Sequence, residues 1–338
     1  AAFSPDGTRI ASGSFDHKIK VWDANSAEEL LSIDAHPGGV YGVAFSPDGR
    51  QIVSGSVVGH DFGSAVAAYA ALIRPDIFRS VALMSAPFGG PPQAPLATAT
   101  TSAKTANTQV AAEEESNAPS TTHAAPSIHA DLARLTRPRK LYQWYYSTRA
   151  ANEDMWKCQQ GVHAFLRAYY HHKSADWVAN TPHMLAGWSA EELARLPTYY
   201  VMDLDKTMAE TVAEEMPSQT EIDACSWLPE PDLAVYTSQY ERNGFQGGLQ
   251  WNRCMTSPHY GAQLRLFGGR TLDVPATFIA GRQDWGVYQK PGALENMETA
   301  VCADYRGTHL IDSAGHWVQQ EQPDAVNARL CAFLQDLN

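Results

Sequence analysis

Three features are scarce or absent in this chain of 338 residues: basic charge, paired cysteines and long apolar runs. Its 25 Lys and Arg face 37 Asp and Glu, a net charge of −12, which excludes the clustered cations of a nucleic-acid-binding surface. No apolar run reaches the ~18 residues of a membrane span, and the N-terminus has no signal-peptide pattern. We therefore expect a soluble, cytoplasmic protein that binds neither nucleic acid nor membranes.

The spacing of the cysteines also favours a cytoplasmic protein. The five cysteines are widely spaced and form no Cys-x-x-Cys pair: Cys158, Cys225, Cys254, Cys302 and Cys331. This spacing is typical of reduced thiols rather than of a disulfide framework or a zinc site. We expect no metal and no cofactor.

The most informative stretch is residues 57–64 (VVGHDFGS). A β-branched run enters it and an Ala-rich segment, 65–73, leaves it, which predicts a strand, a sharp turn and a helix. The turn would project Asp61 above the sheet edge, with Gly59 and Gly63 present because strand and helix approach closely there. The strand is predicted from the alternation of Ile52, Val53, Val57 and Val58.

A carboxylate at such an elbow favours attack on alkyl carbon, because it can open an epoxide or displace a halide and form an alkyl–enzyme ester. Asp284 follows a buried strand, 274–281, and His316 lies on a loop before an amphipathic helix, 323–337. The order Asp61, Asp284, His316 is the nucleophile–acid–base order of α/β-hydrolases. The fold class expected is therefore α/β.

The elbow and residues 73–88 after it resemble the epoxide hydrolases of the α/β-hydrolase superfamily. The resemblance implies that a small apolar epoxide is opened by Asp61, and that water activated by His316 hydrolyses the ester while Asp284 orients the imidazole. The backbone N–H of Phe62 would hold the oxyanion of that second step.

Residues 131–258 are helical and aromatic in pattern and resemble the cap domain of that family, in which two tyrosines hydrogen-bond the epoxide oxygen. Tyr142 matches the first by its Tyr-Gln-x-Tyr setting, and Tyr145 competes with it. In the run expected to carry the second, LQWNR at 249–253, Asn252 replaces the tyrosine, so weaker activity is expected. Substrate contacts are expected from Tyr145, Trp251, Asn252, Trp285 and Trp317, and ordinary cap packing from Tyr199, Tyr200, Tyr236 and Tyr240.

Residues 1–56 have a different origin. The run FSPDG at 3–7 returns at 45–49, 42 residues later, and a half-buried strand ending in Trp22-Asp23 lies between the copies. This period and ending resemble the WD40 family of β-propellers, with Asp16 and His36 at blade positions. A closed propeller typically needs 4–8 blades, so the fragment is too short to serve as a protein-binding platform.

The expected organisation follows from these segments: a WD40-like fragment (1–56), a first core segment with the elbow (57–90), a flexible low-complexity linker (91–130), a helical cap (131–258) and a second core segment with the acid and the histidine (259–338). The resemblance also implies earlier core strands and a His-Gly-x-Pro oxyanion turn, whereas the nearest analogue here, 36–39, fits a WD40 turn. We therefore expect an incomplete α/β-hydrolase core and impaired catalysis.

Two alternatives remain open at this point. A haloalkane dehalogenase shares the Asp nucleophile, but that family places Trp after it to hold the halide, where this chain has Phe62. The other is a catalytically inactive chimera of a WD40 scaffold and a hydrolase, arising from a gene fusion or from an erroneous gene model.

Overall fold

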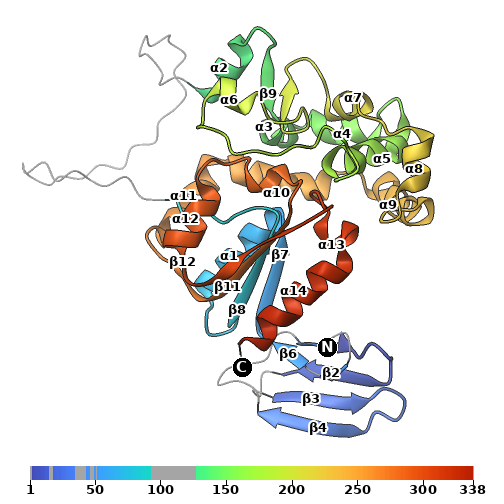
Figure 1. The fold of residues 1–338 in the computed structure, drawn as a ribbon, viewed down its shortest axis with the longest axis vertical. Coiled ribbons are helices and arrows are strands. Elements are labelled where there is room, and N and C mark those ends of the chain that lie inside the picture. Colours follow the sequence, from blue (N-terminus) through green and yellow to red (C-terminus); the bar gives the residue numbers. More distant parts are fainter. Residues whose placement is uncertain are drawn as a thin grey trace, which may run out of the picture.

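The computed structural model contains three units: an N-terminal antiparallel sheet, a parallel α/β core, and a helical cap that is inserted between two segments of the core (Figure 1). It describes residues 2–14, 18–34, 43–45, 49–50, 52–92 and 127–337. The predictions made for Asp16, for 36–39 and for most of the linker lie outside these residues.

The N-terminal sheet has the antiparallel order β1-β2-β3-β4, and a separate pair, β5 with β6, follows it. Alternating side chains of the central strands are buried, including Ala11, Ile19 and Val21. The indole of Trp22 donates to Ser12 Oγ (2.8 Å), which joins neighbouring strands β2 and β3. The bounds are β1 (Ala2–Phe3), β2 (Arg9–Gly13), β3 (Lys18–Asp23), β4 (Glu29–Asp34), β5 (Val43–Phe45) and β6 (Ile52–Ser54).

The core is a four-stranded parallel sheet in the order β12-β11-β8-β7. Its strands are β7 (Ser56–His60), β8 (Ser80–Met84), β11 (Leu272–Gly281) and β12 (Cys302–Ile311). Strand β8 is buried along its whole length, which explains its nearly continuous apolar sequence. Strand β7 lies at an edge of this sheet, and Val58 on it is 51% exposed.

Helices pack on both sides of this sheet: α1 (Phe62–Ile73), α12 (Ala293–Asn296), α13 (Val318–Glu321) and α14 (Pro323–Gln335), with short 3-10 turns η1 (Arg265–Phe267) and η2 (Trp285–Val287) and a π-helical turn η3 (Met297–Val301). The small side chains of Ala67, Ala68 and Ala71 let α1 approach β7 and β8 closely. The strand predicted at 274–281 and the helix predicted at 323–337 are confirmed as β11 and α14.

The β-branched run before the elbow is divided, which corrects its interpretation as one strand. Ile52 and Val53 belong to β6 in the N-terminal unit, while Val57 and Val58 belong to β7 in the core. The break falls at Gly55, whose φ is +77°. The two units therefore meet with one residue between their strands.

The cap lies over the end of the sheet at which β7, β8 and β11 finish, and the N-terminal sheet lies at the opposite end (Figure 1). Ser189 caps α6 by accepting from the N–H of Glu192. The cap elements are α2 (Ile128–Arg134), β9 (Arg139–Leu141), α3 (Tyr142–Ser147), α4 (Ala150–Trp156), α5 (Gly161–Lys173), α6 (Ala190–Leu193), β10 (Val201–Asp203), α7 (Met208–Ala213), α8 (Gln219–Ala224), α9 (Glu230–Asn243), α10 (Gln246–Thr256) and α11 (Pro258–Leu264).

Helix α2 begins at Ile128, so the last residues of the segment predicted to be a linker, 91–130, are helical. None of the helices in the described part of the chain is both long and apolar enough to cross a membrane. The same residues contain no cluster of three or more His, Cys, Asp or Glu with metal-binding geometry.

One buried histidine of the cap makes stability depend on pH. His172 is 1% exposed, neither ring nitrogen has a hydrogen-bond partner, and the ring packs edge-on against Trp177 (4.4 Å) and Tyr199 (4.7 Å). Burial lowers the pKa of His172 to about 3. Below the unfolded value of 6.5 the unfolded chain binds this proton and the folded chain does not, so stability falls as the pH falls towards 3.

We expect His172→Phe to remove this dependence, since phenylalanine fills similar space without titrating. The destabilisation that wild type suffers at pH 4.5 relative to pH 7.5 should shrink by roughly 2–3 kcal/mol. Urea unfolding at both pH values measures it, with His259→Phe at an exposed site as the control. An unchanged pH dependence would show that His172 titrates normally.

Candidate active site

Asp61 lies at a strained turn between β7 and α1. Its backbone has φ 54° and ψ −119°, a conformation that non-glycine residues rarely adopt. The turn is fixed on both sides, because Asp61 N–H donates to Met84 O (3.1 Å) and Ser64 Oγ donates to Ala86 O (2.6 Å). This strain is typical of sites where a side chain is presented for chemistry.

The two glycines of the elbow play different parts. A Cβ at Gly59 would lie 1.9 Å from Gly63 O, so only glycine fits there, as predicted. A Cβ at Gly63 would meet nothing within 4 Å, so the same prediction for Gly63 is wrong. The backbone carbonyl of Gly63 is the group that Gly59 approaches closely, whereas a side chain at position 63 would point into open space.

Three side chains from distant parts of the chain lie in line at the carboxyl end of the sheet. His316 Nε2 is 3.3 Å from Asp61 Oδ2, and His316 Nδ1 is 3.2 Å from Asp284 Oδ1. Asp284 is 1% exposed and also accepts from the N–H of Gly286 (2.7 Å). The imidazole can therefore receive a proton on the nitrogen that faces Asp61 while Asp284 holds the other nitrogen.

Ser85 completes this arrangement, and its role was not predicted from the sequence. Its hydroxyl lies 2.5 Å from Asp284 Oδ2 and 2.9 Å from His316 Nδ1, and its φ is +69°. Because Asp284 only accepts, the hydroxyl donates to it and accepts from His316, which places the proton on Nδ1 and leaves Nε2 free. The available signal was its position directly after β8, where the carboxyl ends of parallel strands gather polar groups.

The charges of Asp61, Asp284 and His316 shift one another's pKa values and favour the ionised form of each group. Burial alone would raise the pKa of Asp61 and Asp284, but the hydrogen bonds and charge of His316 hold both below their ordinary value. Burial and the charge of Lys173 lower the pKa of His316, but Asp284 and Asp61 outweigh them and raise it. Asp61 is thus a carboxylate at neutral pH, available as a nucleophile.

Two aromatic residues, His60 and Trp317, pack against His316. His60 Nε2 bonds the carbonyl of His316 (2.7 Å), and their rings are 4.9 Å apart. Trp317 packs edge-on against the His316 ring (4.7 Å) and donates from its indole to Tyr170 O (2.9 Å) on α5. Trp317, predicted to contact substrate, thus links the histidine loop to the cap.

A pocket of about 280 Å³ lies between core and cap, and its lining includes Gly286, which bonds Asp284, but not Asp61, Asp284 or His316 themselves. Ala86, Pro87 and Gly286 of the core line it, facing Tyr142 and Tyr200 of the cap. Burial and the nearby charge of Asp61 raise the pKa of Tyr142 well above its ordinary range, so its phenol stays protonated as a hydrogen-bond donor. Tyr200 is packed in the core of the cap, as expected from the sequence, and it also lines this pocket.

None of the five residues predicted to contact substrate is among those that line this pocket. Tyr145 does not line the pocket, and its hydroxyl donates to Asp154 (3.0 Å) instead. The structure therefore gives no support to a substrate contact at Tyr145. Trp251 on α10 packs on Phe62 at the elbow (5.5 Å between ring centroids). Asn252 is buried with its Oδ1 unpaired, and Trp285 joins the cap core beside His183 (4.8 Å).

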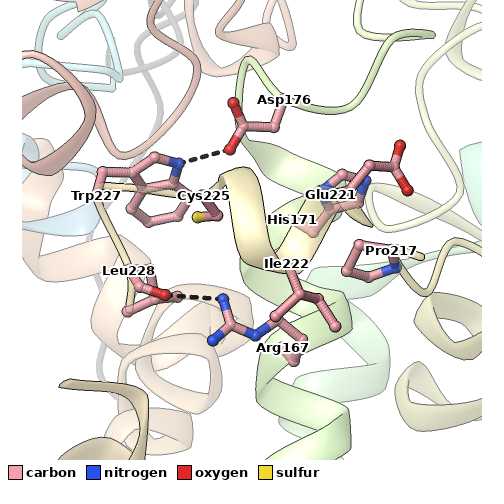
Figure 2. Close-up of a pocket in the computed structure, with 9 residues that line it drawn as sticks. All are labelled: Arg167, His171, Asp176, Pro217, Glu221, Ile222, Cys225, Trp227 and Leu228. Atoms are coloured by element: carbon pink, nitrogen blue, oxygen red, sulfur yellow. Dashed lines mark hydrogen bonds between the residues drawn. The ribbon is translucent and has the colours of Figure 1, made fainter. Parts of the chain in front are cut away.

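A second hollow lies inside the cap, away from this constellation (Figure 2). Two of its polar side chains are already bonded within the cap: Trp227 donates to Asp176 (2.7 Å) and Arg167 donates to Leu228 O (2.9 Å). Its volume of about 10 Å³ is at the lower limit for one water molecule. This hollow is thus a packing defect of the cap, and the pocket lined by Tyr142 is the candidate active site.

Comparison with known proteins agrees with this geometry. Epoxide hydrolase B of Mycobacterium tuberculosis is 38% identical over 112 residues, which are 33% of this chain and 31% of that protein. An epoxide hydrolase of Caballeronia sordidicola is 23% identical over 282 residues, 83% of this chain and 67% of that protein. The match to the Mycobacterium tuberculosis protein thus spans about a third of its length.

Among solved structures, an epoxide hydrolase from an endophytic Streptomyces has a similar fold, with a TM-score of 0.58 at 24% identity, over 83% of this chain and 68% of that one. Residues 1–23 and 27–61 match the sequence profile of the WD domain, G-beta repeat. Residues 54–323 match the profile described as alpha/beta hydrolase fold. With that match across most of its length, and with its parallel sheet, the chain belongs to the alpha/beta hydrolase fold family.

Proposed function

We propose that this chain acts as an epoxide hydrolase through a covalent ester on Asp61. The observation that carries the proposal is the line of Asp61, His316 and Asp284 beside a pocket that Tyr142 lines. The relatives named epoxide hydrolase support it by similarity in sequence, although the nearer of them match over about a third of their length.

In the first step, Asp61 Oδ attacks an epoxide carbon and the C–O bond of the ring breaks. The electron pair of that bond moves to the epoxide oxygen, which takes a proton from a donor as it leaves. Tyr142 is the proposed donor, because its phenol remains protonated beside the Asp61 carboxylate. The product is an alkyl–enzyme ester carrying a new hydroxyl group.

In the second step, His316 Nε2 takes a proton from water, and the resulting hydroxide attacks the ester carbonyl. Asp284 and Ser85 hold the imidazole by Nδ1 and stabilise its charged form. The N–H of Phe62, at the first position of α1, is the proposed donor to the oxyanion, because the first N–H groups of a helix have no partner within it. Collapse of the intermediate releases the diol, which takes the proton from His316. The proton left on the regenerated Asp61 carboxyl then returns through solvent to the Tyr142 phenolate, which restores both groups.

The class of substrate is proposed from the lining of the pocket. Leu141, Leu193 and Leu196 supply apolar surface, and we propose a small apolar epoxide. Trp251 and Asn252, on the helix above Phe62, are proposed to contact its far end. The N-terminal sheet lies at the opposite end of the core and is given no part in this chemistry (Figure 1).

Mass spectrometry after acid quench tests this proposal directly. The full chain is incubated with an aryl epoxide, quenched within milliseconds to seconds and digested. We expect one adduct of the epoxide's mass on the peptide containing Asp61, followed by diol in solution. Folded protein that forms no adduct would contradict the proposal and favour an inactive fusion, and release of halide from a haloalkane without diol formation would favour a dehalogenase.

We expect His316→Gln to separate the two steps. The amide cannot act as a base, whereas the attack by Asp61 needs no proton transfer to His316. Ester hydrolysis should therefore slow by roughly 10²–10⁴-fold while the adduct accumulates to one per chain. Time courses of adduct and diol measure it, and equal loss of both signals would show that His316 is required for alkylation too.

A further inference from the structure

Lys173, the last residue of α5, is a buried cation without an ion pair. It is 4% exposed, and within the described ranges no carboxylate lies within 4 Å of its Nζ. Four aromatic rings surround the ammonium group, with Nζ-to-centroid distances of 5.3 Å to Tyr169 and Trp317 and 5.6 Å to Tyr199 and Tyr200. Ring faces attract a cation without neutralising it, so its field reaches neighbouring groups.

The backbone around Lys173 is fastened to the histidine loop. Its carbonyl accepts from the N–H of His316 (2.9 Å), and a Cβ at Gly315 would lie 2.6 Å from the main chain of Ser174. The carboxylate of Glu321 accepts from Ala175 N–H (2.8 Å) on one side and Gly315 N–H (2.9 Å) on the other. The backbone of Lys173 is therefore fixed relative to His316, and Trp317, which follows His316 in the chain, is one of the rings around the ammonium group.

We propose that Lys173 is a positioning residue whose fixed positive charge keeps His316 neutral once Asp61 has been esterified, so that the imidazole can act as the base of the second step. This inference rests on the proposed function. It gives the cap a part in the release of the ester besides its part in holding the epoxide.

The charges that face His316 differ between the free and the esterified protein. In the free protein two carboxylates, Asp61 and Asp284, act against one ammonium, and the pKa of His316 is raised. The charge of Lys173 opposes this rise and also helps to lower the pKa of Asp61. When the ester forms, the charge of Asp61 disappears, and one carboxylate is left against one ammonium in a buried site.

The remaining titratable neighbours do not change this balance. Burial lowers the pKa of His60 on β7, so it stays neutral, and burial raises those of Tyr142, Tyr199 and Tyr200 well above their ordinary range. Burial raises the pKa of Glu321 to about 7, but this residue bonds the backbone of the loop and is present in both states. The pKa of His316 should thus fall on esterification because Lys173 is no longer opposed by Asp61.

The test is an NMR titration of the His316 imidazole in the full chain. Asp61→Asn serves as a neutral stand-in of equal size for the esterified carboxylate, so no turnover is needed. We expect Asp61→Asn to lower the His316 pKa, and Lys173→Met in that background to raise it again by roughly 1 unit. Lys173→Arg should keep the low value, and Lys157→Met, at an exposed lysine over Trp156, should have no effect.

The pH profile of ester hydrolysis gives a second readout. We expect Lys173→Met to move the acidic limb of the pH–rate profile for ester hydrolysis to higher pH, by the same amount as the rise in the His316 pKa. At high pH the hydrolysis rate should return to near the wild-type value. A uniform loss of rate with an unmoved His316 titration would overturn the proposal and leave Lys173 a packing residue. If Lys173→Met fails to fold, a His316 pKa that does not fall in Asp61→Asn alone also overturns it.

The two proposals fail in different ways. Absence of an Asp61 adduct in wild type removes the proposed function, while the NMR result on Asp61→Asn stands unaffected. An adduct with no movement of the His316 titration removes only the role of Lys173.

Discussion

Asp61→Asn is expected to abolish diol formation, with a loss of about 10⁵-fold or more, and to prevent the covalent adduct. Asparagine has the size of aspartate but its amide is not a nucleophile, so the variant removes the attacking atom and leaves the elbow intact. The turn is fixed by backbone and Ser64 contacts that do not involve the carboxylate. Diol formation and peptide mass after quench are the measurements.

Two comparisons make this result interpretable. Asp76→Asn, at a 64% exposed carboxylate after α1, should retain full activity. His316→Gln should retain the adduct and lose its release, whereas Asp61→Asn should lose both. Turnover that survives in Asp61→Asn would mean that another group attacks the substrate, and the assignment of the elbow would be wrong.

The largest expected effect on stability comes from Gly59→Ala. The added methyl carbon would lie 1.9 Å from Gly63 O and 2.4 Å from Gly63 C, so backbone rather than a flexible side chain would have to move. Strand β7 and helix α1 would be forced apart where they meet. We expect a loss of roughly 3 kcal/mol or more in the free energy of unfolding, measured by urea denaturation.

Gly63→Ala is the matched control in the same turn. Nothing lies within 4 Å of the methyl position, and the residue is already in α1, where alanine is favoured over glycine. Stability should stay equal or rise by about 0.5–1 kcal/mol. Equal destabilisation by both variants would contradict the close approach at Gly59 and point to a general sensitivity of the elbow.

Local patterns in the sequence were sufficient for the elements that carry the chemistry. The strand, turn and helix around Asp61, the buried strand before Asp284 and the loop before the last helix all follow from periodicity and small-residue spacing. Each of these features depends on residues within about ten positions of one another in the sequence. It could therefore be predicted without knowledge of the tertiary contacts. The N-terminal strands were expected on a different ground, because the FSPDG run returns 42 residues later and resembles the WD40 repeat.

The division of the β-branched run at Gly55 could not be predicted in this way. Residues on either side have the same strand propensity, and only their partners differ: β6 pairs with β5, while β7 pairs with β8. Strand pairing is a long-range choice that a local pattern does not contain. The end of the repeat placed the expected boundary between residues 56 and 57, but the pairing that divides the β-branched run is a property of the folded chain.

The sequence by itself determined which residue sits at the elbow, the order of Asp61, Asp284 and His316, and the match of Tyr142 to the cap. The tertiary structure alone decided that Ser85 lies between Asp284 and His316, that Tyr200 lines the pocket and that Lys173 is buried among rings. These contacts join the cap with residues that follow β8, β11 and β12, and Ser85 and His316 are 231 positions apart. The physical reason is that backbone preferences act between near neighbours, whereas the meeting of side chains depends on the alignment of parallel strands and on the cap packing over their ends.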